Sequence, residues 1–381
     1  MKLSGHDPRP PEAAAGLSHH RTVDRTLLHR HHLTEVFLTD IRRTGADSFV
    51  AAALLPAVHP HYTSHSAQTS LRHLDPMLLL ECCRQAETAA AHLCHGVDRD
   101  SSFVLRNWSM ELTDEVPRGL PGTVPVSTEL TMTALTHDPR HRAGRLSGLS
   151  YAFTLWAAGA HLGDVRMEVG YVARAAYRVM RRGKRTGPPP SSDTCPPAAL
   201  GTALEPARAG RLHARDTLLL DAVARATGCT ATLRPAADNP SLFDHPQDHV
   251  PGMVLVEAAR QLAAFAVAEG NATAEGNATA EGAAGAGGRA VRPEQSVMVT
   301  MRAAFFAYAE LDAPTTMTAL PGREHRVEVT FRQNGADIAT VELQLAALTG
   351  HRGTDGTDGT DGADGQARAV EAGTAAPARG R

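Results

Sequence analysis

Two neighbouring acid–histidine pairs stand just before an apolar run in the second half of the chain. The segment FDHPQDHVPGM covers residues 243–253 and contains Asp244, His245, Asp248 and His249. A histidine close to a carboxylate can take up or return a proton during a reaction. The alternative is that Asp248 caps the following helix and that the histidines lie on a solvated loop.

Pro251 and Gly252 follow these pairs and mark the start of a helix. Proline suits the first helical turn, and glycine leaves the backbone open to a ligand. The first N–H groups of a helix have no partner within it, so those of Gly252 and Met253 could bind an anion or a developing oxyanion. The segment therefore predicts acid–base chemistry at a helix N-terminus.

The predicted helix, GMVLVEAARQLAAFAVA (252–268), is apolar on nearly every side and should be buried. Its polar residues before the last turn are Glu257, Arg260 and Gln261, whose spacing places them on one face. A buried carboxylate must be paired, hydrated or protonated. Two interpretations remain open. Either the glutamate and the arginine form an ion pair that only neutralises their buried charges, or this helix face lines a ligand cavity.

An internal repeat places these residues in a duplicated unit. Residues 72–85 read RHLDPMLLLECCRQ, and residues 248–261 read DHVPGMVLVEAARQ. At a constant offset of 176 positions (257 − 81), the first-copy counterparts are His73, Glu81, Arg84 and Gln85. Asp75 and Pro76 stand where the second copy has Pro251 and Gly252, and losing the glycine disfavours an oxyanion site there. A duplicated domain is the simplest explanation.

The elements around each predicted helix follow the same order in both copies. A β-hairpin (34–40 and 47–55 in the first copy) precedes the long helix (76–94 and 252–268), and four β-rich segments follow. These segments are 102–112, 123–135, 145–157 and 161–172, and in the second copy about 295–309, 314–320, 324–333 and 337–348. Strands joined by short turns around one helix predict an α+β fold with an antiparallel sheet.

Low-complexity segments predict the domain boundaries. We expect a disordered arm over 1–32, a first repeat over 33–180, a Pro-rich linker over 181–212, a second repeat over 213–348 and a disordered tail over 349–381. Within the second repeat, the AEGNAT repeat and the residues after it (268–290) predict an expanded surface loop.

Composition argues against several classes of protein. A formal charge of −3 from 38 basic and 41 acidic residues provides no basic field for nucleic acid. The five cysteines form no even framework, which favours a reduced, cytoplasmic protein, and no apolar run predicts a membrane helix. Candidate metal-ligand pairs occur, but none has zinc-site spacing, so no metal is expected: His59-x-His61, His92-x-x-His95 and His245-x-x-x-His249.

The segment FDHPQDHVPGMVLVEAARQ (243–261) resembles the second hotdog repeat of the A-factor synthase family, the γ-butyrolactone autoregulator synthases of actinomycetes. Segments 34–49, 73–85 and 175–182 also resemble family segments, so the resemblance covers about 33–348. It implies tandem hotdog folds, each a long central helix wrapped by an antiparallel sheet, paired in one chain as a pseudo-dimer. A more distant resemblance is to hotdog 3-hydroxyacyl-carrier-protein dehydratases, with His245 in the place of their histidine.

The resemblance implies an acyltransferase that moves a 3-oxoacyl group from acyl carrier protein to the hydroxyl of dihydroxyacetone phosphate. The product, a 2-oxo-3-(phosphooxy)propyl 3-oxoalkanoate ester, would cyclise to a butenolide phosphate. No cofactor is expected beyond the phosphopantetheine of the carrier, and the enzyme would be a monomeric pseudo-dimer or a homodimer. The alternatives are a hotdog 3-hydroxyacyl-thioester dehydratase or thioesterase, and a non-catalytic acyl- or butyrolactone-binding module.

Under this hypothesis Glu257 or His245 deprotonates the attacking hydroxyl, and Arg260 or its counterpart Arg84 binds the phosphate. The predicted catalytic residues are Glu257, His245, His249 and Gly252, and the predicted substrate-binding residues are Arg260, Gln261, Asp248 and Met253. The first-repeat counterparts are His73, Asp75, Glu81, Arg84 and Gln85. An acidic carrier protein would dock on the Arg-rich stretch 174–185, for which a solvated face is an equal alternative.

Overall fold

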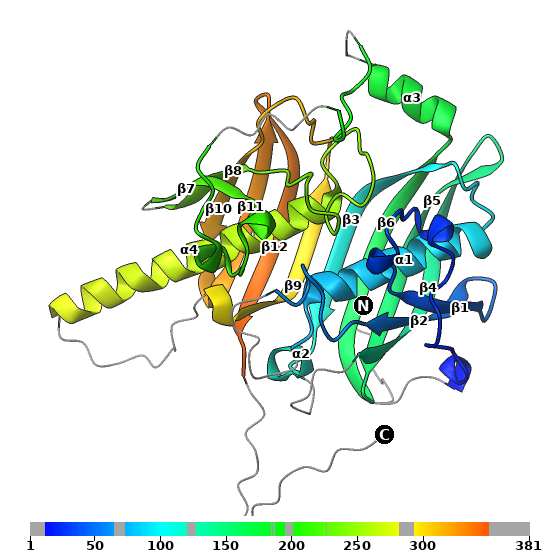
Figure 1. Cartoon of the computed structure of the whole chain (residues 1–381), viewed down its shortest axis with the longest axis horizontal. Coiled ribbons are helices and arrows are strands. Elements are labelled where there is room, and N and C mark those ends of the chain that lie inside the picture. Colours follow the sequence, from blue (N-terminus) through cyan, green and yellow to red (C-terminus); the bar gives the residue numbers. More distant parts are fainter. Residues whose placement is uncertain are drawn as a thin grey trace, which may run out of the picture. The chain divides into compact units, whose positions relative to one another are not determined.

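Each half of the chain folds into a hairpin, a long helix and four further strands (Figure 1). The computed structural model describes residues 12–64, 73–119, 127–183, 185, 187–194, 201–225, 227–281 and 293–349. The first repeat contains β1 (Leu38–Arg43), β2 (Ser48–Leu55), α1 (Pro76–Leu93), β3 (Ser102–Leu112), β4 (Thr128–Arg142), β5 (Arg145–Ala157) and β6 (Ala160–Val172). The second contains β7 (Leu219–Arg225), β8 (Gly228–Leu233), α4 (Gly252–Glu281), β9 (Ser296–Phe305), β10 (Thr316–Pro321), β11 (Arg326–Gln333) and β12 (Ala336–Ala347).

Shorter helices occupy the connections between these elements. They are α2 (Glu115–Arg118), α3 (Arg174–Arg182) and the 3-10 turns Glu12–Ala14, Arg25–Leu28, Leu33–Glu35, Pro206–Ala209, Ala214–Asp216, Pro293–Gln295 and Arg323–His325. The helix α3 follows β6 directly and thus lies at the junction of the two repeats along the chain.

The strands of both repeats join into one antiparallel sheet. Its order is β1-β2-β4-β5-β6-β3-β9-β12-β11-β10-β8-β7. Read from its outer edge, each half has the same order, with β7 in the place of β1 and β9 in the place of β3. The halves meet where β3 pairs with β9, with Ser109 opposite Arg302. This pseudo-twofold arrangement confirms the predicted duplication and the predicted α+β tandem hotdog fold.

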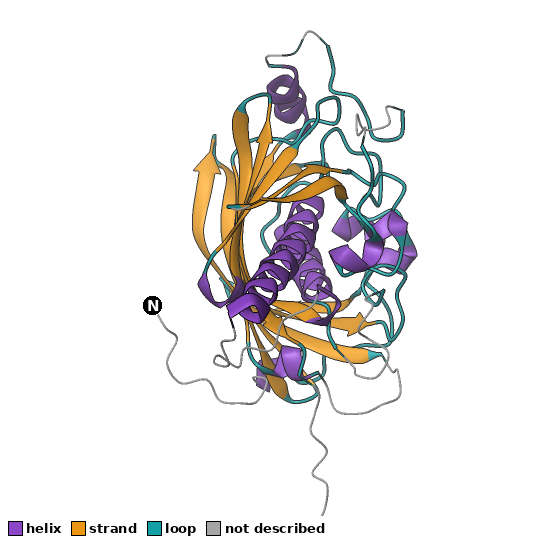
Figure 2. Cartoon of the chain, turned by 90° about the vertical axis from the view of Figure 1, so that its left-hand side faces the viewer, coloured by secondary structure: helices purple, strands orange, loops and turns teal. Residues whose placement is uncertain are grey.

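The sheet curves around the two long helices, which lie against its inner face (Figure 2). The helices begin near the middle of the sheet and run in opposite directions (Figure 1). The start of α1 is fixed by Asp75, whose side chain accepts the N–H of Met77 at 2.9 Å, and by Pro76 in the first turn. Both helices bury Leu, Met and Ala side chains, with Cys added in α1 and Val in α4, so each forms the core of its repeat.

The sequence predicts a disordered arm over 1–32, and this prediction is wrong for residues 12–32. Leu28 is 0% exposed within the core, and Arg30 pairs with the buried Glu81. The N–H of Val23 donates to the carbonyl of Leu38 at 3.0 Å. These contacts involve residues far along the chain, so local composition could not reveal them.

Two further boundaries differ from the predictions. The linker predicted over 181–212 is shorter, because α3 extends to Arg182, and Ala209 and Arg211 are buried in the second repeat. The loop predicted over 268–290 is helical as far as Glu281, where α4 ends. Alanine and glutamate favour helix, which outweighs the two glycines of this repeat. Residues 282–290, 350–381 and the first 11 residues lie outside the described residues.

No helix among the described residues is long and apolar enough to span a membrane. Cys82, Cys83, Cys94 and Cys229 are free thiols, and Cys195 lies outside the described residues.

Candidate active site

A cavity of about 520 Å³ lies between the N-terminal end of α4 and the middle of α1. One wall is the loop of the second repeat that carries both acid–histidine pairs and ends at Gly252 and Met253. The opposite wall contains Arg84 and Glu87 of α1, which belongs to the first repeat. The cavity is therefore composite, and one chain supplies both of its walls.

Asp244 orients His245 at the edge of this cavity. Its Oδ2 lies 3.3 Å from Nδ1 of His245, and its carboxylate accepts the N–H of His31 at 2.6 Å and of His32 at 3.0 Å. Burial alone raises the pKa of Asp244, but these hydrogen bonds lower it to about 2. Nε2 of Gln247 lies 2.7 Å from Nε2 of His245. An amide N–H donates there, so Nδ1 carries the histidine's proton and Nε2 is the basic nitrogen.

The second pair, Asp248 and His249, anchors the loop to α3. Oδ1 of Asp248 lies 2.6 Å from Nδ1 of His249 and accepts the hydroxyl of Tyr177 at 2.8 Å. Nε of Arg181 donates to Oδ2 of Asp248 at 3.1 Å, and the same guanidinium pairs with Glu310 at 2.7 Å. The capping alternative for Asp248 is wrong, because α4 begins four residues later, at Gly252, and these oxygens face α3.

Gly252 lets α4 approach the sheet at the point where the two repeats meet. A Cβ atom at this position would lie 2.5 Å from Cδ1 of Leu105 on β3 and 3.3 Å from the ring of Phe305 on β9. A larger residue would push the helix start away from these strands of the sheet. Since the first helical N–H groups lack intrahelical partners, the turn at Gly252 and Met253 is suited to an anion or an oxyanion.

Three arginines, Arg30, Arg84 and Arg174, also line the cavity. Arg84 donates through Nε to Glu81 at 2.8 Å, and Arg30 pairs with the same carboxylate. The side chain of Arg84 remains 19% exposed, and Arg174 is exposed. This concentration of cationic groups suits a phosphate.

Glu257 does not line this cavity and lies in a closed network within the second repeat. It is 0% exposed and pairs with Nη2 of Arg211 at 2.5 Å and with Nε of Arg260 at 2.9 Å. Burial alone raises the pKa of Glu257, but the charges of Arg211 and Arg260 hold it well below its ordinary value. Gln261 donates to this carboxylate at 2.5 Å. The geometry favours the interpretation of a paired carboxylate, and a direct role of Glu257 in catalysis stays a prediction.

Glu81 lies in an equivalent network in the first repeat. Arg84, Gln85 and Arg30 donate to its carboxylate. Burial alone raises its pKa, whereas the charges of Arg30 and Arg84 lower it to about 2. Each helix thus buries a carboxylate between two arginines.

Sequence reasoning missed Arg30 and Arg211, although a spacing in the sequence could have revealed them. Arg30 precedes Glu35 by five positions, Arg211 precedes Asp216 by five, and both pairs share an offset of 181 (211 − 30 and 216 − 35). The glutamine of each helix binds the segment that follows the corresponding arginine in the chain. Gln85 accepts the N–H of Phe37, and Gln261 accepts that of Leu218. Both arginines were hidden in segments whose composition predicts an arm and a linker.

The pseudo-equivalent position at the start of α1 is nearly closed. The described residues there enclose about 30 Å³, between His73, Asp75 and Pro76 on one side and Arg260 on the other. Thus Arg260 faces the start of the other repeat's helix, as Arg84 does in the large cavity. The structure brings together His245, His249, Asp248, Gly252, Met253 and Arg84, and it separates them from Glu257, Arg260, Gln261, His73, Asp75, Glu81 and Gln85.

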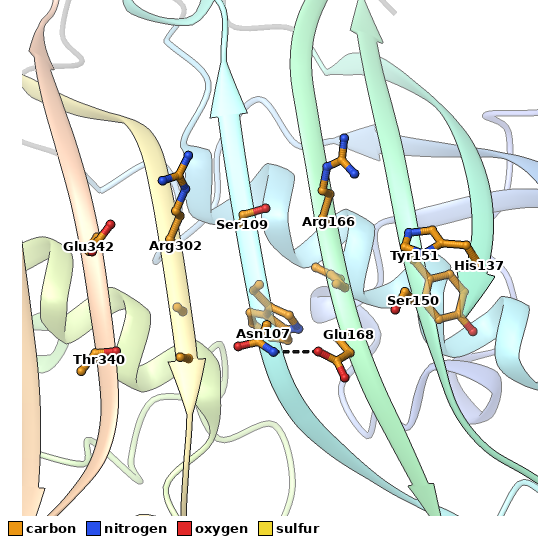
Figure 3. A pocket seen from close by; sticks show the side chains of 14 residues that line it. Asn107, Ser109, His137, Ser150, Tyr151, Arg166, Glu168, Arg302, Thr340 and Glu342 are labelled. Carbon is orange, nitrogen blue, oxygen red and sulfur yellow. Dashed lines mark hydrogen bonds between the residues drawn. The ribbon is translucent and has the colours of Figure 1, made fainter. Parts of the chain in front are cut away.

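A second hollow, of about 550 Å³, lies on the outer face of the sheet (Figure 3). Its side chains come from neighbouring strands and include Asn107, Glu168 and Arg302, with Asn107 donating to Glu168 at 2.7 Å. Its lining contains no helix N-terminus, and its acids, arginines and histidine are exposed or half-buried. We interpret it as the solvated face of the sheet, and the cavity beside α4 as the candidate active site.

No group of three metal-ligating side chains occurs within the described part of the chain. His59 and His61 point to different acids: Nε2 of His59 lies 3.4 Å from Glu35, and Nδ1 of His61 lies 3.0 Å from Asp216.

Burial raises the pKa of the Cys82 thiol well above its ordinary value, which argues for a packing role.

The fold and the site define a tandem hotdog protein whose composite cavity lies between its two central helices. The chain belongs to the A-factor biosynthesis hotdog domain family, whose model matches residues 13–173 and 192–349. The sequence resemblance is therefore confirmed.

Curated relatives share nearly their whole length with this chain. It is 30% identical over 338 residues to the 2-oxo-3-(phosphooxy)propyl 3-oxoalkanoate synthase of Streptomyces virginiae, covering 87% of this chain and 98% of that one. A protein of the same name from Streptomyces coelicolor is 28% identical, with 86% and 93% covered. Among solved structures, an acyl-ACP thioesterase from Bacteroides thetaiotaomicron aligns with 78% of this chain and 98% of its own at 10% identity and a TM-score of 0.40.

Proposed function

We propose that the protein transfers a 3-oxoacyl group from a carrier thioester to the hydroxyl of dihydroxyacetone phosphate. The printed name of the curated relatives describes the ester that this reaction forms. The observation that carries the proposal is the cavity beside α4. It combines an oriented histidine, a helix N-terminus and three arginines in about 520 Å³.

In the proposed step, the attacking hydroxyl replaces the amide of Gln247 at Nε2 of His245, and this nitrogen accepts the hydroxyl proton. The hydroxyl oxygen bonds to the thioester carbon while the N–H groups at Gly252 and Met253 stabilise the oxyanion. The C–S bond then breaks, leaving the ester and a thiolate. Arg84, Arg30 and Arg174 bind the phosphate in place of the sequence candidate Arg260, which lies outside this cavity.

The proposed chemistry requires no resident cofactor, since acyl transfer moves no electrons to an acceptor. We further propose that the acyl group arrives on the phosphopantetheine of an acidic acyl carrier protein that docks on α3. This helix reaches the cavity through Arg174 and Tyr177. Arg174, Arg178 and Arg182 are spaced four residues apart and are all exposed.

The test is incubation of the purified full chain with a 3-oxoacyl carrier protein, with and without dihydroxyacetone phosphate. We expect thiol release only when the triose phosphate is present, and a phosphorylated ester by mass spectrometry. Release without it would indicate a thioesterase, and turnover of a 3-hydroxyacyl carrier protein would indicate a dehydratase. Binding of the thioester without any turnover would indicate a binding module. Each of these three results would contradict the proposal.

Arg178→Glu tests the carrier surface. We expect KM for the carrier-bound substrate to rise by roughly tenfold, with a smaller effect at high salt, because surface charges steer association. KM for the same acyl group on free pantetheine should not change. Arg323→Glu, the same charge change at an exposed residue of the second repeat, is the control. Equal effects of Arg178→Glu on both donors would count against this surface.

A further inference from the structure

Glu87 is a buried acid in the wall of the active-site cavity. It has no role in the step proposed above. It lies on α1, is 2% exposed and lines the cavity opposite the start of α4. The hydroxyl of Tyr171 on β6 donates to Oε1 at 3.3 Å, and the hydroxyl of Thr88 donates to Oε2 at 3.2 Å. Tyr171 is itself 2.6 Å from the hydroxyl of Tyr151 on β5.

These partners distinguish Glu87 from the other buried acids of the two helices. Glu81 and Glu257 each have two arginines in direct contact, whereas Glu87 has neutral hydroxyls. Burial raises the pKa of Glu87 to about 8, although the charge of Arg84 and the hydrogen bonds from Thr88 and Tyr171 lower it. A carboxyl group with this environment is protonated at neutral pH and can give a proton to a ligand.

The second repeat has no counterpart of this acid. At the offset of 176, Glu87 corresponds to Ala263 (87 + 176), which is fully buried on α4. The repeat therefore folds without an acid at this position. The two sites also differ in size. The cavity that Glu87 lines has a volume of about 520 Å³, whereas the pseudo-equivalent position between the start of α1 and Arg260 of α4 encloses about 30 Å³.

We propose that Glu87 is the general acid that protonates the departing thiolate. The inference rests on the proposed acyl transfer and completes its proton balance. His245 takes one proton from the hydroxyl as the C–O bond forms, and Glu87 gives one to the sulfur as the C–S bond breaks. The proton on His245 then returns to Glu87 through solvent after the thiol has left. The ionisable groups nearest to Glu87 are Arg84 from α1, Tyr171 from β6 and Tyr151 from β5, and His29, Arg30 and His245 border the same cavity.

Glu87→Gln keeps the size of the side chain and removes the proton. We expect kcat with an alkyl thioester to fall about 100-fold or more with little change in KM, as for loss of a general acid. A general acid works only while protonated, so wild-type activity should decline as pH rises through about 8, and the variant should lack this decline. An aryl thioester releases a stable thiolate that needs no proton, so it should restore most of the variant's activity.

A structural role would give a different pattern of results. If Glu87→Gln is as active as the wild type, or if alkyl and aryl thioesters are impaired equally, the inference is wrong. Thermal unfolding confirms that the variant is folded, and Glu87→Asp, which keeps the proton, should retain more activity than Glu87→Gln. If the wild type releases thiol without dihydroxyacetone phosphate, the proposed acceptor is wrong. The comparison of leaving groups still tests Glu87 in that case.

Discussion

His245→Ala is expected to lower kcat for acyl transfer by about 10²- to 10⁴-fold, because it removes the base that accepts the hydroxyl proton. Substrate binding should change little, since the arginines and the start of α4 remain. The measurement is steady-state thiol release in the presence of dihydroxyacetone phosphate. Asp244→Asn should also lower kcat, because the ionised Asp244 holds His245 in the productive tautomer.

The control for His245 is His137→Ala. His137 forms a similar pair with Asp138, with Nδ1 and Oδ2 2.7 Å apart, but its side chain is 46% exposed on β4. This variant should keep wild-type activity. If His245→Ala retains more than about a tenth of wild-type kcat, His245 is not the base, and Glu257 or His249, the other sequence candidates, would have to be tested.

Glu257→Gln is expected to destabilise the fold by about 3–5 kcal/mol, because it leaves Arg211 and Arg260 buried without a negative charge. The measurement is the free energy of unfolding in denaturant, with unfolding monitored by circular dichroism. Glu342→Gln, at an exposed position of β12, is the control and should lie within about 0.5 kcal/mol of the wild type.

The activity of Glu257→Gln separates a structural role from a catalytic one. If Glu257 only stabilises the fold, activity per folded molecule should stay near the wild-type value. A large loss of kcat at unchanged stability would instead support the sequence prediction that Glu257 is the base. The folded-state pKa of Glu257 is depressed, so its contribution to stability exists above the ordinary carboxyl pKa and is lost as pH falls. For Glu81 this loss of stability should occur as the pH falls from about 4.5 to about 2.

Much of the fold follows from local patterns in the sequence. The predicted segments 102–112 and 145–157 coincide with β3 and β5, and the helix predicted over 76–94 matches α1 within one residue. The strand segments are rich in aromatic and β-branched residues, and the helix is a long apolar run that begins at a proline. The predictions of a disordered arm and a linker are wrong at Arg30 and Arg211, because these residues bind carboxylates that are distant in the sequence.

The sequence by itself determined the duplication, the two buried helices and the acid–histidine loop, since each is a pattern within one continuous segment. It also led to the prediction that the loop and the Glu–Arg–Gln face of the same helix share one site. Only the tertiary structure decided that the loop of the second repeat faces Arg84 and Glu87 of the first. The physical reason is the antiparallel pairing of β3 with β9, which sets the start of α4 against α1. The same pairing brings Arg260 to the nearly closed position at the start of α1, so two similar repeats provide one open site.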